Sequence, residues 1–317
     1  MEKERDYKFD NLRLILIFFV IFAHCLELFS NSITLDIYRV IYLFHMPVFI
    51  FLTGRFAKFD AKKIFKRLII PYFVFQTLYE IFSDLVLNKT DLAVQYTTPY
   101  WILWFLLTII IYYLLLPLLP KKESKFKYLA IGISFAIGLA VGFEKTIGYY
   151  LSLSRTLVFL PLFLVGYYST DIYQDIQKII KKPKLIGLIV SIVLIISITT
   201  VLILNKVPKQ ALYGSYAYSK QNGSILTRAL IYIVSLAWII FFLLVIPNKR
   251  IPFVSVLGKD TMLIYLLHGF IIKSFGLLKV FRFNNSINIL ISVALSIGII
   301  ILFGNKYIVK LFSKITK

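Results

Sequence analysis

Cysteine is nearly absent from this 317-residue chain, in which Cys25 is the single one. One cysteine excludes an internal disulfide and any metal site built from cysteines. Acidic residues are also scarce, because 15 Asp and Glu stand against 36 Lys and Arg, which gives a formal net charge of +21. The chain shows no internal repeat, no low-complexity tract and no segment with the composition of a soluble domain. We therefore expect one membrane domain over residues 1–317.

Apolar residues make up most of the chain. Hydrophobic residues account for 59% of it and aromatic residues for 17%, and the mean hydropathy is +0.83, far above that of soluble proteins. Apolar runs long enough to cross a bilayer as helices recur along the whole length. The sequence predicts an all-α, polytopic integral membrane protein with about ten transmembrane helices, at residues 11–29, 38–54, 68–87, 100–119, 128–143, 147–168, 185–204, 225–246, 259–275 and 287–304.

The positions of the basic residues predict the orientation. If the chain enters from the cytoplasm and the ten spans alternate, most Lys and Arg fall on the cytoplasmic side, where such residues accumulate. Both termini are therefore expected in the cytoplasm. The first apolar stretch is too long for a typical signal peptide, so we expect it to be retained as a helix. Nucleic-acid binding would need a basic patch interleaved with aromatic residues on a soluble face, and the sequence has none. We therefore expect the partner of the chain to be the lipid bilayer and not a nucleic acid.

Ionisable residues inside the first two spans are the strongest functional signal. Such groups are costly in hydrocarbon and by default mark a functional site. Arg13 and His24 are eleven residues apart, which places them on one helix face about 16 Å apart. His24 and His45 are expected at the same depth in the outer half of the bilayer, with Glu27 and Arg39 at the outer rim. This arrangement predicts a polar site, whereas the alternative is that each histidine only bonds a neighbouring helix.

A second group of cations follows the second span. Lys66 and Arg67 lie at the start of the third span and, with Arg13, are candidates for holding phosphates at the cytoplasmic surface. The alternative is that the lysines only set the orientation. A ligand with a phosphorylated head at these cations and a thin reactive arm reaching His24 would fit, and coenzyme A thioesters have this shape.

Five segments together resemble the membrane acyltransferase-3 family, especially its fucose 4-O-acetylase-like branch. They are the Arg13 to His24 element, FHMPVF at 44–49 running to Gly54, KRLIIPY at 66–72, RTLVFLPLFLVGYY at 155–168 and GKDTMLIYLLH at 258–268. They occur in the expected order over most of the chain. Arg55 departs from the family pattern, in which an aromatic residue is commoner after the glycine, and the role of this position stays open.

This resemblance implies a membrane O-acyltransferase, most often an O-acetyltransferase. Its cosubstrate would be cytoplasmic acetyl-CoA or another acyl-CoA, without a metal. The acceptor would be a hydroxyl of a cell-surface or extracellular polysaccharide, or of its lipid-linked precursor. The expected location is the bacterial plasma membrane. Many relatives carry an extracytoplasmic hydrolase-like domain, and we expect a stand-alone member without one.

Residue roles follow from the chemistry of acyl transfer. Histidine is well matched to removing a hydroxyl proton near neutral pH, so we expect His24 to be the base. His45 or Arg155 is expected to stabilise the charge that develops on the thioester oxygen. Direct transfer and an acyl-histidine intermediate both fit. His268 is expected either to pack or to line the donor tunnel, too low in the membrane to meet the other two histidines, which argues against a three-histidine metal site.

Aromatic and basic residues toward the outer side are candidates for the acceptor site. The longest outer loop, 205–224, is rich in tyrosine, includes Tyr216 and is followed by Arg228. Trp104 lies near the outer end of the fourth predicted span. Such rings either bind sugars or anchor the protein at the lipid interface.

The competing class is a transporter or flippase of a glycan or small anionic solute. Such proteins also bury charges among many helices, but they more often show internal repeats or paired broken helices. Neither feature is evident in the sequence.

Overall fold

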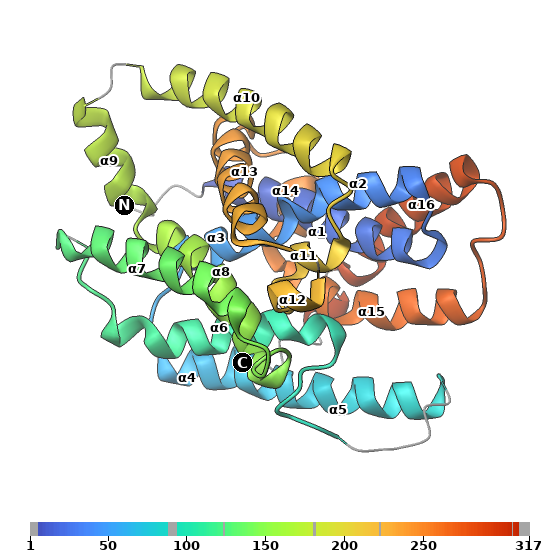
Figure 1. Ribbon diagram of the computed structural model, residues 1–317. Helices are drawn as coiled ribbons and strands as arrows, with labels where there is room; N and C mark the ends of the chain where they lie inside the picture. The colour runs from blue at the N-terminus through green and yellow to red at the C-terminus, as the bar shows by residue number, and fades with distance from the viewer. Residues whose placement is uncertain are drawn as a thin grey trace. The chain divides into compact units, whose positions relative to one another are not determined.

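The computed structural model describes residues 6–87, 94–122, 124–179, 182–221, 223–305 and 307–310. The regular structure in these ranges is helical, without strands, which confirms the all-α prediction (Figure 1). Eight helical segments of the described chain are long and apolar enough to cross a membrane, so this is a multi-pass membrane protein. The predicted spans 68–87 and 259–275 form shorter helices. The predicted cytoplasmic termini fall on residues 1–5 and 311–317, outside the described residues.

The chain divides into two compact units. Unit 1 comprises residues 1–41, 73–94 and 245–317, and unit 2 comprises residues 42–72 and 95–244. Unit 1 contains α1 (Tyr7–Leu26), most of α2 (Ser32–Tyr42), most of α5 (Ile70–Leu85), α14 (Val254–Leu257), α15 (Thr261–Leu277) and α16 (Asn285–Phe303). Unit 2 contains α3 (His45–Arg55), α4 (Ala61–Ile64), α6 (Trp104–Leu115), α7 (Phe126–Ala140), α8 (Leu153–Tyr167), α9 (Ser169–Ile179), α10 (Pro183–Leu204), α11 (Lys209–Tyr213), α12 (Tyr218–Gln221) and most of α13 (Ile225–Val245).

In unit 1, α1 packs against α14, α15 and α16. Asn11 fixes the start of this helix, because its amide donates to the carbonyls of Pro247 and Lys249 and its side-chain oxygen accepts from the Ser255 hydroxyl at 2.7 Å. A side chain at Gly258 would overlap the Asp10 carbonyl, so glycine permits the close approach of the two segments. The chain leading into α15 is thereby held against the first turns of α1.

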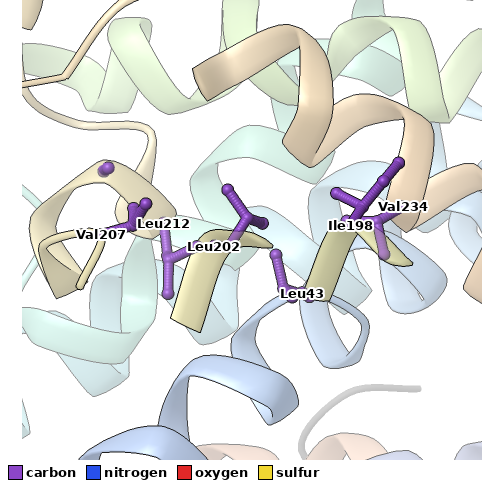
Figure 2. Packing of buried hydrophobic residues seen from close by; sticks show 7 residues of the cluster. Leu43, Ile198, Leu202, Val207, Leu212 and Val234 are labelled. Carbon is purple, nitrogen blue, oxygen red and sulfur yellow. The ribbon is translucent and has the colours of Figure 1, made fainter. Parts of the chain in front are cut away.

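In unit 2, α3, α6 and α7 all pack against α8 (Figure 1). The core near α10 and α13 is a cluster of aliphatic side chains that Figure 2 shows from close by, formed by Leu43, Ile198, Leu202, Val207, Leu212 and Val234. Its members come from α10, α11, α13, the link between α10 and α11, and the residues before α3. Aliphatic packing therefore holds the segment that precedes α3 in place.

The second predicted span is broken. Residues 38–54 were expected as one helix, whereas α2 ends at Tyr42 and α3 begins at His45. Phe44 has φ −129°, outside the helical region. The Leu43 carbonyl at this break accepts a hydrogen bond from the Ser235 hydroxyl at 3.0 Å, so a neighbouring helix satisfies a backbone group that the break exposes.

Two further boundaries differ from the predictions. The span predicted at 147–168 forms a regular α-helix only from Leu153, because Leu151 and Ser152 have φ of 47° and 55°, which a right-handed helix does not accommodate. The outer loop 205–224 was expected as loop, and it contains the short helices α11 and α12.

Two glycines bring α3 and α8 into direct backbone contact. A side chain at Gly54 would overlap the Phe163 carbonyl, and one at Gly166 would overlap the Phe51 carbonyl. The contacts are reciprocal, so each helix presents a glycine to the backbone of the other. Small residues allow such close packing between membrane helices.

We expect Gly54→Ala and Gly166→Ala each to destabilise the protein by about 1–3 kcal/mol, since the added methyl group overpacks the interface. Thermal unfolding in detergent would show this as a melting temperature lower by several degrees. Gly132 of α7 provides the matched control, because a side chain there meets nothing within 4 Å. If Gly132→Ala is as destabilising as the other two, the close α3–α8 contact is not the cause.

Candidate functional site

His24 lies in the last turn of α1, and its side chain is buried in unit 1. Its Nδ1 is 3.5 Å from Oε2 of Glu27, one turn further along. Oε1 of Glu27 accepts a hydrogen bond from the Tyr38 hydroxyl at 2.6 Å. A carboxylate beside one ring nitrogen orients an imidazole, an arrangement found around histidines that act as general bases.

His268 of α15 packs directly on His24. The two rings are stacked with centroids 5.7 Å apart, and His268 is fully buried. Nδ1 of His268 is 2.6 Å from the Tyr265 carbonyl. Because a carbonyl only accepts hydrogen bonds, Nδ1 of His268 carries a proton, and in the neutral ring Nε2 is then an acceptor.

The expectation that His268 lies too low to meet the other histidines is wrong for His24. Gly258 packs on Asp10, so α15 starts beside the first turns of α1. His268 follows Gly258 by about ten residues and His24 follows Asp10 by about fourteen, a difference of about 6 Å in height. Two imidazole side chains span that difference.

Arg13 pairs with an acid of its own helix. Its Nη1 is 3.2 Å from Oδ1 of Asp10, which is buried. The sequence argument treated Arg13 as a cation and did not weigh Asp10 three residues earlier, although this spacing is a usual one for helical ion pairs. Arg39 likewise pairs with Asp36, at 2.6 Å. Both arginines are thus positioned by a nearby carboxylate.

His45 begins α3 at the helix break in unit 2 and is 2% exposed. Its ring meets the Tyr42 ring edge-on, with centroids 4.5 Å apart. His24 belongs to unit 1, so the predicted site shared by His24 and His45 stays a prediction.

Arg155, near the start of α8, is surrounded by aromatic rings. Its guanidinium lies 5.0 Å from the ring centres of both Trp104 and Tyr149, and its Nε donates to the Tyr213 carbonyl at 3.2 Å. The Tyr149 hydroxyl donates to that of Tyr216 at 2.8 Å. Arginine stacks well on aromatic faces. The predicted acceptor residues Trp104 and Tyr216 and the predicted charge-stabilising Arg155 therefore belong to one cluster.

Arg228 of α13 is 3% exposed. Its two terminal nitrogens donate to the carbonyls of Gly138 and Tyr216, and its guanidinium lies 4.6 Å from the Tyr218 ring centre. The described residues provide no ion-pair partner for it. A buried guanidinium held by carbonyls keeps its positive charge and raises the local potential.

Lys66 and Arg67 lie in a π-helical turn, Phe65–Ile69, between α4 and α5. Arg67 is exposed. Such turns insert an extra residue into a helix and often occur at functional sites. Arg13 belongs to the other unit, so the predicted joint phosphate site with Lys66 and Arg67 stays a prediction.

Comparison with models of protein families identifies the family of this chain. The profile of the acyltransferase-3 family, described as an acyltransferase domain, matches residues 6–304. The chain belongs to the acyltransferase-3 family. No curated protein and no solved structure gives a match. As a member of this family, the chain is a multi-pass membrane acyltransferase.

The sequence analysis missed several residues that contact the candidate site residues. Tyr38 was taken as the start of a span, Asp10 was not considered, and Tyr149 was not singled out. Asp10 has a readable signal in its spacing to Arg13, and Glu27 has the same spacing to His24. Tyr149 and Tyr216 are far apart in sequence, so nothing local predicts that they meet.

We expect Glu27→Gln to lower the acyltransferase turnover number by roughly tenfold or more, because the amide does not stabilise a protonated His24, and a general base contributes about 10²–10⁴-fold. Glu144→Gln is the matched control, since Glu144 is exposed and bonds only Thr146 and Lys145 in the described structure. Steady-state kinetics of both variants tests this. Equal activity of the two variants would rule out a role for the Glu27 carboxylate.

Proposed function

We propose that this acyltransferase moves an acetyl group from acetyl-CoA to a sugar hydroxyl. The acceptor is a polysaccharide outside the cell or its lipid-linked precursor, and the enzyme works in the bacterial plasma membrane as a member of the fucose 4-O-acetylase-like branch. The observation that carries the proposal is the buried His24 imidazole 3.5 Å from the Glu27 carboxylate, in a chain of the acyltransferase-3 family.

The proposed reaction begins with proton removal. His24 takes the proton of the sugar hydroxyl, whose oxygen attacks the carbonyl carbon of the thioester. Glu27 stabilises the imidazolium ion that results. The carbon–sulfur bond then breaks, and the imidazolium returns its proton to the departing thiolate of coenzyme A. The products are the O-acetyl sugar and free coenzyme A.

Charge develops on the thioester oxygen during this attack. A well-placed donor contributes about 3–4 kcal/mol to its stabilisation. His45 and Arg155 are the proposed donors. Both are tied to fixed groups, His45 to the Tyr42 ring and Arg155 to the Tyr213 carbonyl, which lowers the cost of orienting them.

The two substrates call for different surfaces. Coenzyme A carries phosphates, and we assign them to Arg13, Lys66 and Arg67, with His268 beside the reacting base. Sugars offer apolar ring faces and hydroxyls, which suit the cluster of Trp104, Tyr149 and Tyr216 around Arg155. Arg228, Glu27 and Arg39 complete the proposed acceptor contacts.

The test is turnover of acetyl-CoA by the purified protein in nanodiscs, measured as release of free coenzyme A and as transfer of labelled acetyl groups to a polysaccharide fraction. We expect His24→Gln to retain acetyl-CoA binding and to lower turnover by about 100-fold or more, because glutamine does not accept a proton. Phe22→Leu, two residues earlier in α1, is the packing control and should keep its turnover.

Binding tests the proposed phosphate contact. Arg13→Gln should weaken acetyl-CoA binding about tenfold while turnover at saturation changes little, as expected for a residue that contacts only the distant end of the donor. The exposed Arg282 gives the charge-matched control Arg282→Gln. A wild-type protein that neither binds nor consumes any acyl-CoA would disprove the proposal and favour a transporter.

A further inference from the structure

A small cavity lies in unit 2 beside the helix break. Its volume is about 20 Å³. Apolar side chains form most of its wall, among them Val158, Phe159 and Leu162 of α8 and Leu212 of α11. Arg228 also lines it, so the cavity has one strongly polar end.

The polar end has hydrogen-bonding capacity to spare. A guanidinium carries five N–H groups. In the described structure, one terminal nitrogen of Arg228 donates to the Gly138 carbonyl and the other to the Tyr216 carbonyl, and the guanidinium also bonds the Tyr218 side chain. These three hydrogen bonds use three of the five N–H groups, so two remain for a ligand. A carbonyl oxygen or an anionic oxygen is the kind of group that they would bind.

The cavity adjoins a proposed catalytic residue. Tyr42 and Pro47 both line it, and His45 lies between them at the start of α3. The His45 ring packs on that of Tyr42, with centroids 4.5 Å apart. A group bound in the cavity is thus near the imidazole to which we assign stabilisation of the thioester oxygen.

The size of the cavity limits what it holds. A cavity needs about 10–15 Å³, measured in this way, to hold one water-sized group. A volume of about 20 Å³ therefore fits one or two such groups. Beyond its carbonyl carbon, an acetyl group has two such groups, a methyl group and an oxygen atom. A butyryl group has two more carbon atoms and would not fit.

We propose that this cavity is the acyl pocket of the enzyme and selects a two-carbon acyl group. The inference rests on the proposed function, in which an acyl-CoA is the donor. The methyl group lies against Val158 and Leu162, and the carbonyl oxygen faces Arg228. Arg228 then serves the acyl donor, as a further hydrogen-bond donor to the thioester oxygen beside His45 and Arg155, and no longer contacts the acceptor. Val158 and Leu162 are then the residues that determine acyl-chain length.

The test enlarges the apolar wall and measures selectivity. Acetyl-CoA and butyryl-CoA compete in one reaction, and the ratio of their kcat/KM values is determined from the acylated products. Val158→Ala should raise the ratio of butyryl to acetyl transfer about tenfold, because one or two methylene groups in an apolar pocket change discrimination by about 10–200-fold. Leu162→Ala opens the same wall and should do likewise.

Val234→Ala is the matched control. Val234 is buried in unit 2 like Val158, but it lies in the cluster of Figure 2 and does not line the cavity. It should keep the wild-type ratio. Because the ratio is measured within one sample, a lower fraction of folded protein does not change it.

The outcomes separate the two proposals. If the wild type uses acetyl-CoA but Val158→Ala and Leu162→Ala both keep its selectivity, the acyl-pocket proposal is wrong and the proposed function stands. The same holds if Val234→Ala changes the ratio as much as they do. If the wild type uses neither thioester, both proposals fail.

Discussion

The cost of placing polar groups in hydrocarbon governs this structure. A buried side chain that carries charge or a proton must find its partner inside the protein. The partners here are close and specific: Asp10 for Arg13, Glu27 beside His24, and main-chain carbonyls for Arg228 and His268. The same requirement applies to the backbone, since the carbonyl left at the α2–α3 break is bonded by Ser235. The polar groups therefore fix the positions of the helices, and some of them are also candidate site residues.

The sequence predicts the helices well because hydropathy over some twenty residues is a strong signal. It does not predict where they are interrupted. The break before His45 has a local cause that the prediction overlooked, because Pro47 lacks the N–H that would bond the Leu43 carbonyl four residues earlier. The left-handed residues Leu151 and Ser152 have neither glycine nor proline at the interruption, and there the sequence carries no sign of it.

The sequence singles out His24, His45, Arg155 and Arg228 by their type and position, and their roles stay predictions. It gives no information on distances between segments. The contact of His268 with His24 was wrongly excluded, because residue counts along separate helices fix height only to about one turn. The Arg155 cluster joins residues from three distant parts of unit 2, an arrangement that only tertiary structure reveals.

The reciprocal contact of Gly54 with Phe163 and of Gly166 with Phe51 has a consequence for motion. The backbones of α3 and α8 touch at two points, about one helical turn apart. Sliding or rotation of one helix against the other would therefore produce a clash. We therefore expect α3 and α8 to move as one rigid body. Flexing during a catalytic cycle is then confined to the ends of this pair, at the break before His45 and at the turn before Leu153.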